Sequence, residues 1–203
     1  MIIKHLTKSP QIHSSAFIAP TATICGDVKI GENSRILHNC SLVAEGGSIE
    51  IGENCIVLEN VVIRSTENFS TSIGDNVLIG PNSHIVGSKI ENCVFIATGA
   101  SIFHGSHIGY NSEVRINGVV HLKTYLPPNS TVPINWVAVG NPVKFFSPDR
   151  HDEIWQVQKS LNFPKSVYNV DRPKDGETIM PQITQYYSKL LSTHKDDEIL
   201  DKS

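Results

Sequence analysis

The sequence predicts an all-β solenoid, a parallel β-helix of about six coils followed by α-helices. The first observation is a rhythm of aliphatic residues six positions apart, which runs from Ile12 to Leu42 without interruption. The second is that the residue four places after each aliphatic one is usually small or β-branched. The third is that glycine and asparagine gather between these units, at corners that need positive φ. A period of six fits short strands joined by turns, and neither a continuous strand nor a helix.

The pattern has a regular centre, two interruptions and an expected end. Its centre runs from Ile73 to Ile108. Insertions at 44–48 and 65–71 shift the phase, and loops in solenoids leave from corners and often carry function. The repeat is expected to stop near Leu126, where two prolines begin a turn. The segment WVAVGNPVKFF that follows would then close the end of the solenoid.

We expect two domains, the solenoid over 1–146 and a helical extension over 147–203. The second begins with Ser147, Pro148 and Asp149, which are typical of an N-cap, a first helical position and a first-turn acid. The spacing of apolar residues then predicts an amphipathic helix. Its apolar side would consist of Ile154, Trp155, Val157 and Leu161.

The rest of the extension predicts a linker and a second helix. Residues 162–178 are rich in proline, lysine and aspartate and indicate a linker. A second amphipathic helix is expected from about Pro181 to Leu200. The apolar face of this helix would contain Ile183, Tyr187, Leu190 and Leu191.

The composition narrows the classes of partner. The chain has 203 residues and a net charge of −3, so no basic excess points to nucleic acid. No apolar run is long enough to cross a bilayer and the N-terminus has no leader pattern, so we expect a cytoplasmic protein without a membrane partner. The four cysteines show no CxxC spacing and are interpreted as reduced packing residues.

The stretches AFIAPTATICGDVKIGENSRI, IGDNVLIG and VGNPVK make residues 9–146 resemble the γ-class carbonic anhydrase branch of the hexapeptide-repeat proteins. The resemblance implies a left-handed coil and a homotrimer. In that family, three histidines bind zinc in the cleft between adjacent subunits. The matching positions here hold Arg64, in VVIRS, and Pro81 and Val86, in IGPNSHIVG.

None of these three side chains replaces a zinc-ligating histidine. A guanidinium repels a cation, and proline and valine have no donor atom. Positions that surround the ligands in the family also differ, and hold Val43, Glu45, Leu58 and Glu59 here. The comparison therefore implies no metal and no other cofactor, and hydration of carbon dioxide by the zinc mechanism is not expected.

A polar cluster is expected in the region of the lost zinc site. Arg64 could bind a carboxylate or phosphate, with Glu45, Glu59 and Asn82 as further binding residues. His84 could act as a general acid or base. We therefore predict that a small anionic ligand is bound or processed in the cleft between subunits. The alternative at this place is an Arg64–Glu59 salt bridge across the interface, with His84 on a solvated turn.

Two other functions stay open. One is acyl transfer from coenzyme A thioesters with His84 or His104 as the base, although the sequence shows no long acceptor loop and no acyltransferase motif. The other is a non-catalytic trimeric scaffold. His38, His107 and His121 are interpreted as structural, and His104 and His107 need not converge on one ion.

Overall fold

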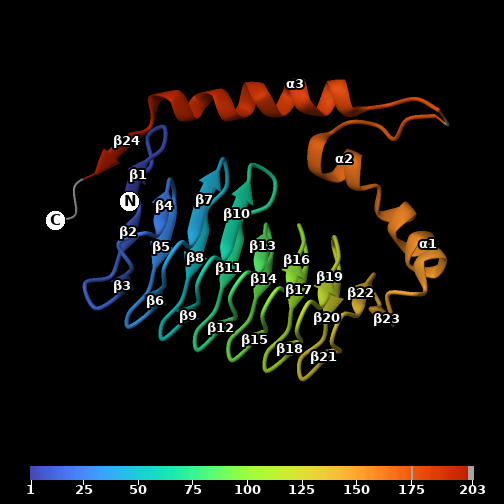
Figure 1. Ribbon diagram of the computed structural model, residues 1–203, viewed down its shortest axis with the longest axis horizontal. Coiled ribbons are helices and arrows are strands. Elements are labelled where there is room, and N and C mark those ends of the chain that lie inside the picture. Colours follow the sequence, from blue (N-terminus) through green and yellow to red (C-terminus); the bar gives the residue numbers. More distant parts are fainter. Residues whose placement is uncertain (175, 201–203) are drawn as a thin grey trace.

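The computed structural model describes residues 1–174 and 176–200, and it confirms the predicted parallel β-solenoid (Figure 1). Each turn of the chain adds one short strand to each of three sheets, so strands three places apart pair in parallel. None of the helices within these ranges is long and apolar enough to span a membrane.

The strands form three sheets, which we call the first, second and third sheet. The first holds β1 (Ile2–Lys4), β4 (Thr23–Cys25), β7 (Ser41–Glu45), β10 (Val62–Thr66), β13 (His84–Val86), β16 (Ser101–Ile102), β19 (Val119–Val120) and β22 (Val137–Val139), with β23 (Lys144–Phe146) and β24 (Glu198–Leu200) at its edges. The second holds β2 (Gln11–Ile12), β5 (Val28–Ile30), β8 (Ile49–Ile51), β11 (Thr71–Ile73), β14 (Lys89–Ile90), β17 (His107–Ile108) and β20 (Tyr125–Leu126). The third holds β3 (Phe17–Ile18), β6 (Arg35–Ile36), β9 (Ile56–Val57), β12 (Leu78–Ile79), β15 (Phe95–Ile96), β18 (Glu113–Val114) and β21 (Thr131–Val132).

The solenoid is longer than predicted. Seven strands build each of the second and third sheets and ten build the first. In the first sheet β23 pairs antiparallel with β22, and β24 pairs antiparallel with β1. The chain thus makes about eight turns, and the predicted number of about six was too low. It missed β1, which precedes the first unit of the rhythm, and the units of Val132 and Ala138, which follow Leu126. The two prolines after Leu126 therefore form one more corner rather than the end.

The aliphatic rhythm builds the core. In the first sheet Ile63, Ile85 and Ile102 lie in register and are fully buried. Because successive side chains of a strand point to opposite faces, the residues beside these isoleucines point outward. The strands that build the core therefore also present a row of side chains on the outer face of the first sheet.

Small residues and left-handed corners allow the coils to stack. Cys40 and Cys55 are buried free thiols, as predicted for packing residues. Gly87 has a φ of +53°, and a Cβ atom there would lie 2.4 Å from Cβ of Phe69, so the inserted loop 65–71 packs directly on this glycine. Asparagines with positive φ occupy many corners: Asn33, Asn39, Asn54, Asn60, Asn76, Asn82, Asn111, Asn117, Asn129 and Asn135.

Three helices follow the solenoid, α1 (His151–Leu161), α2 (Phe163–Tyr168) and α3 (Met180–Leu191). The first begins later than predicted, since its N-cap is Arg150 and no side chain caps it. Instead of a continuous linker, the segment after Leu161 contains α2, because Asn162 and Asn169 in the left-handed conformation bound one short helix.

The last helix ends earlier than predicted. A 3₁₀ segment, η1 (Ser192–Asp196), follows α3 and leads into β24. The predicted helix to Leu200 was wrong because these last residues pair antiparallel with β1, with Ile3 opposite Ile199. Pairing with a distant strand overrides the local helical pattern here.

The helices pack through fewer residues than the patterns predicted. In α1, Ile154 is buried against Val139 and Phe146, while Trp155 is 37% exposed and lies under the guanidinium of Arg172. In α3, the predicted face is half-buried except for Leu191, which is exposed. The division into domains at residue 146 stays a prediction.

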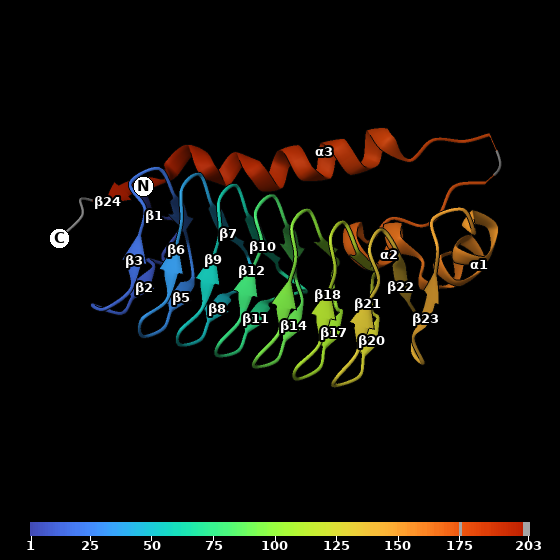
Figure 2. The same cartoon turned by 60° about the horizontal axis from the view of Figure 1, so that its bottom comes forward.

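The helix α3 runs along one edge of the solenoid from its last coils back to its first (Figures 1 and 2). Both inserted loops leave the solenoid on this side, at the ends of β7 and β10 (Figure 1). The loop 65–71 folds back on itself through paired backbone hydrogen bonds between Thr66 and Phe69. The insertions and the C-terminal helices therefore meet over the outer face of the first sheet.

Candidate functional site

The candidate site lies on the outer face of the first sheet. Arg64 of β10 is in register with Val43 of β7 and Val86 of β13. His84 begins β13 and is in register with Val62. Successive side chains of a strand point to opposite faces, so Arg64 and His84 point outward while their neighbours Ile63 and Ile85 point into the core.

Arg64 forms an ion pair with Glu45, and its Nη2 lies 2.5 Å from Oε1 of the carboxylate. The Glu45 side chain is 7% exposed and that of Arg64 is 29% exposed. Burial opposes the charge of Arg64 but the hydrogen bond and charge of Glu45 outweigh it, so the pKa of Arg64 is raised. Oε2 of Glu45 is buried and has no hydrogen-bond partner among the described residues.

Two neutral imidazoles lie near this pair. Burial, and next the charge of Arg64, lower the pKa of His84. His104 is 8% exposed, and burial, followed by the charges of His84 and Arg64, lowers its pKa to about 4. Its Nδ1 atom is buried without a partner in the described part of the chain. At neutral pH both rings are therefore uncharged and able to accept a proton or a hydrogen bond.

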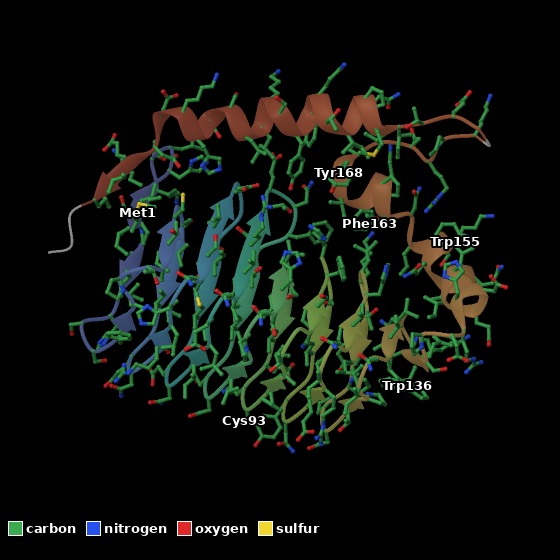
Figure 3. The ribbon with its side chains drawn as sticks, viewed as in Figure 1. Met1, Cys93, Trp136, Trp155, Phe163 and Tyr168 are labelled. Atoms are coloured by element: carbon green, nitrogen blue, oxygen red, sulfur yellow. The ribbon has the colours of Figure 1, made fainter. Side chains whose placement is uncertain are left out.

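Aromatic side chains from outside the repeat enclose His104. Phe69 of the inserted loop and Phe163 of α2 contact it edge to face, with ring centroids at 5.5 and 6.2 Å. Tyr168 contacts Phe163 at 5.9 Å and Tyr187 of α3 at 5.6 Å, and Figure 3 shows Phe163 on the solenoid side of α2 and Tyr168 near α3. Sequence analysis missed this group because Phe163 and Tyr168 lie in the predicted linker and Phe69 lies in an insertion.

Glu59 and Asn82 lie elsewhere, at the corner that leads from the third sheet into the first. Asn82 is exposed with a φ of +60°, and its backbone N–H donates to the carbonyl of Glu59. Pro81 precedes Asn82 at this corner, whereas Val86 lies beside Arg64. Among the described residues no ion pair joins Arg64 to Glu59, so one chain brings together Arg64, Glu45 and His84 but not the two corner residues.

His194 reaches this site, with its Nε2 3.7 Å from Oε1 of Glu45, whereas three other histidines form different contacts. His107 contacts Glu91 at 2.7 Å on the second sheet and does not converge with His104. His38 contacts Thr21, and His121 lies beside Phe103. Within the described ranges one group has the residues and spacing for a metal ion: His5, Cys25, His194 and Asp197.

Replacing His104 with phenylalanine should reduce the acid sensitivity of folding. The pKa of His104 is about 4 in the folded chain and about 6.5 when unfolded, so the unfolded state binds more protons between these values. Stability from this residue is complete above pH 6.5 and falls as the pH drops towards 4, by on the order of 3 kcal/mol in total. Urea unfolding at pH 7 and pH 5 should show a smaller difference for His104→Phe than for the unmodified chain.

The matched control for this measurement is His13→Phe, which changes an exposed histidine at a corner. It should keep the pH dependence of the unmodified chain. An equal dependence for His104→Phe and the unmodified chain would show that His104 already carries a proton in the folded state or is solvated.

Known proteins similar to this chain include several carbonic anhydrases, and no protein-family model matches it. γ-Carbonic anhydrase 1, mitochondrial, of Arabidopsis thaliana is 30% identical over 200 residues, which cover 94% of this chain and 70% of that protein. γ-Carbonic anhydrase 2, mitochondrial, of the same plant is 30% identical over 75% of this chain. The matched region spans only 55% of the length of that protein. A carbonic anhydrase of Geobacillus kaustophilus is 28% identical over 78% of this chain and 84% of its own.

Solved structures share the fold. A Bacillus cereus protein described as an acetyltransferase has a TM-score of 0.62 at 24% identity, over 96% of this chain and 98% of its own. The UDP-N-acetylglucosamine acyltransferase of Francisella novicida has a TM-score of 0.53 at 19% identity, over 95% and 85% of the two chains. At these identities the likeness concerns architecture alone. The sequence similarity to γ-carbonic anhydrase 1 goes further, and this chain belongs to the γ-carbonic anhydrase family.

Proposed function

We propose that the chain forms a homotrimer that binds or processes a small carboxylate or phosphate at Arg64, in the cleft between subunits and without the zinc mechanism. The observation that carries the proposal is the free edge of the Arg64 guanidinium. Glu45 accepts a hydrogen bond from Nη2, whereas no described residue accepts one from Nε or Nη1. The side chain is 29% exposed, and the donors of this edge could bind an anion.

The proposal replaces metal chemistry with fixed positive charge. Positions 64, 81 and 86, which match the zinc-ligating histidines of the family, hold arginine, proline and valine. Arginine at the first of them supplies a cation that cannot lose its proton at physiological pH. Glu45 holds this cation in place. Arg64 could therefore replace zinc in binding an anionic ligand, but it could not replace zinc in activating water.

Two groups of residues have proposed roles around the ligand. His84 would be the general acid or base, because its imidazole is neutral and lies on the same face as Arg64. Glu59 and Asn82 would line the cleft from the neighbouring subunit, since the corner beside Pro81 is the part that the family resemblance brings to a partner. This arrangement explains why they are binding candidates although one chain keeps them apart from Arg64.

Calorimetric titration with inorganic phosphate, bicarbonate and acetate tests the site. The unmodified chain should bind at least one of these anions, and Arg64→Lys should weaken that binding by about tenfold or more because lysine lacks the planar fork of donors. Arg115→Lys is the control, as Arg115 forms a more exposed ion pair with Glu113 elsewhere. Equal binding by Arg64→Lys and the unmodified chain, or no binding of any of the three anions, would refute the proposal.

Acyl transfer is the second candidate, and it rests on the neutral imidazoles of His84 and His104. Either could take the proton of an acceptor hydroxyl or amine as it attacks the thioester carbonyl, and could pass that proton to the coenzyme A thiolate that leaves when the C–S bond breaks. Titration with acetyl-coenzyme A would support this function if binding occurs and disappears in His84→Ala or in His104→Phe. Absence of binding to the unmodified chain would eliminate it.

The trimer is testable by mass. Light scattering after gel filtration should give three times the chain mass of 22.3 kDa. A monomer would contradict both the trimer and the cleft between subunits, while leaving the geometry around Arg64 unchanged.

We also propose the cytoplasm as the location. All four cysteines are free thiols, which is typical of a reducing compartment. Fractionation of cells that express the chain with a C-terminal tag should recover it in the cytosol. Recovery from mitochondria, where the names of two plant relatives place those proteins, would overturn this location.

A further inference from the structure

Four side chains with metal-binding atoms meet where the end of the chain joins its beginning. We call His5, Cys25, His194 and Asp197 the clasp cluster. His5 follows β1, Cys25 ends β4, and the other two come from η1 and the residue after it. One ligand atom of each residue can be chosen so that all four lie within 4.8 Å of one another.

The separations within the clasp cluster suit a small ion. Oδ1 of Asp197 lies 2.6 Å from Nδ1 of His5, and its Oδ2 lies 2.8 Å from Nδ1 of His194. Sγ of Cys25 lies 3.8 Å from the same Oδ2. Ligands in a tetrahedral zinc site are separated by about 3.3 to 3.8 Å, so small rotations of these side chains would form one.

The cluster is enclosed and its residue types are specific. His5 is 5% exposed and Cys25 is 2% exposed, and the two imidazole rings stack with centroids 4.2 Å apart. Two imidazoles, one thiolate and one carboxylate form a set that zinc prefers, whereas calcium and magnesium prefer oxygen ligands. Convergence of these types from three distant segments is not required by the six-residue rhythm.

A carboxylate next to the cluster supplies an independent observation. Nε2 of His194 lies 3.7 Å from Oε1 of Glu45, and the other oxygen of Glu45 is buried without a partner in the described residues. A zinc-ligating histidine usually donates its second N–H to a carboxylate. With Nδ1 of His194 on the ion, its Nε2–H would point toward Glu45, and a small movement of either side chain would bring the two within hydrogen-bond distance.

We propose that the clasp cluster binds one zinc ion, which fastens η1 and β24 onto the first coil of the solenoid. The ion would replace the hydrogens that link Asp197 to the two Nδ1 atoms and to the Cys25 thiol. The thiol proton would leave to solvent, and each neutral imidazole would carry its one proton on Nε2. None of its four residues is one of the family positions 64, 81 and 86, although Glu45 lies next to both Arg64 and His194, and the inference does not depend on the proposed function. The sequence led us to expect no zinc and to interpret Cys25 as a reduced packing residue.

The test uses the full chain purified without chelators. Elemental analysis should find one zinc per chain, and zinc titrated into chelator-treated protein should bind again in calorimetry. Cobalt substituted for zinc should give a thiolate-to-metal charge-transfer band. Zinc should also slow hydrogen exchange of the amides in β24, a readout that is independent of any activity.

Matched variants separate the site from its surroundings. Cys25→Ser should weaken zinc binding by about tenfold or more and abolish the charge-transfer band, whereas Cys93→Ser, which changes an exposed cysteine, should leave both unchanged. If Cys25→Ser does not fold, Asp197→Asn takes its place. Arg64→Lys should keep zinc, so failure of the anion site and failure of the zinc site give different results.

Three outcomes would overturn the inference. The first is that the unmodified chain binds no zinc by either method. The second is that Cys25→Ser, or Asp197→Asn in its place, binds zinc as tightly as the unmodified chain. The third is that the amides of β24 exchange equally slowly with and without zinc, which would show that hydrogen bonds alone hold β24 on the first coil.

Discussion

Ile85→Ala is expected to lower the free energy of unfolding by about 3 to 4 kcal/mol. Ile85 is fully buried and lies in register between Ile63 and Ile102. Its neighbours belong to the coils on either side and are fixed by the hydrogen-bond ladders of all three sheets, so they cannot move into the space that the side chain leaves. Urea unfolding followed by circular dichroism measures the loss.

The control for this prediction is Ile116→Ala, which removes an isoleucine that is 46% exposed. Its effect should stay within about 0.5 kcal/mol. The denaturant slope must also be compared, because coils of a solenoid contact only their neighbours and a weakened coil can unfold separately. A loss below about 1 kcal/mol for Ile85→Ala would mean that the core of the solenoid can rearrange.

The fold could be predicted because one simple pattern specifies it. Each six-residue unit repeats the same physical requirement, an inward aliphatic side chain followed by a tight corner. The ends were underestimated for the same reason. The β1 strand precedes the first clear unit, and Ala138 contributes a small side chain where the pattern leads one to expect a large one.

The candidate site was predictable only in part. Counting units tells on which face of the solenoid a residue lies, but not how far a strand extends into an insertion or which side chains it brings into contact. Glu45 was assigned to an inserted loop, but the structure extends β7 through it and pairs it with Thr66. This register brings Glu45 to Arg64, two residues away on the next coil. The alternative, an ion pair of Arg64 with Glu59 across the subunit interface, stays a prediction, and Glu59 of the same chain lies at the preceding corner.

The clasp cluster could not have been found from the sequence. His5 and Asp197 are 192 positions apart and neither belongs to the repeat. Their meeting depends on α3, which returns the chain along the whole solenoid, and on the pairing of β24 with β1 (Figure 2). The sequence pattern predicted a helix over these last residues and gave no indication of this return to the first coil.

Arg64→Met is expected to destabilise the chain by about 3 kcal/mol, because it leaves the carboxylate of Glu45 buried without a charge partner. Methionine keeps most of the length and the apolar stem of arginine, so packing is largely preserved. His194 remains 3.7 Å away, which is too far for a hydrogen bond. The loss should be measured by urea unfolding at pH 7 beside Arg115→Met, which breaks an exposed ion pair and should cost about 0.5 kcal/mol.

Addition of Glu45→Gln to Arg64→Met shows whether the lost stability comes from the unpaired charge of Glu45 or from the missing Arg64 side chain. Once the carboxylate is neutral, no buried charge remains, so the double variant should recover most of the lost stability although the ion pair is absent. A double variant as unstable as Arg64→Met would show that the loss does not come from an unpaired charge on Glu45. Recovery would instead show that Arg64 is held in place by Glu45 and that its stabilising effect is mainly to neutralise that residue, which leaves the free edge of the guanidinium available for a ligand.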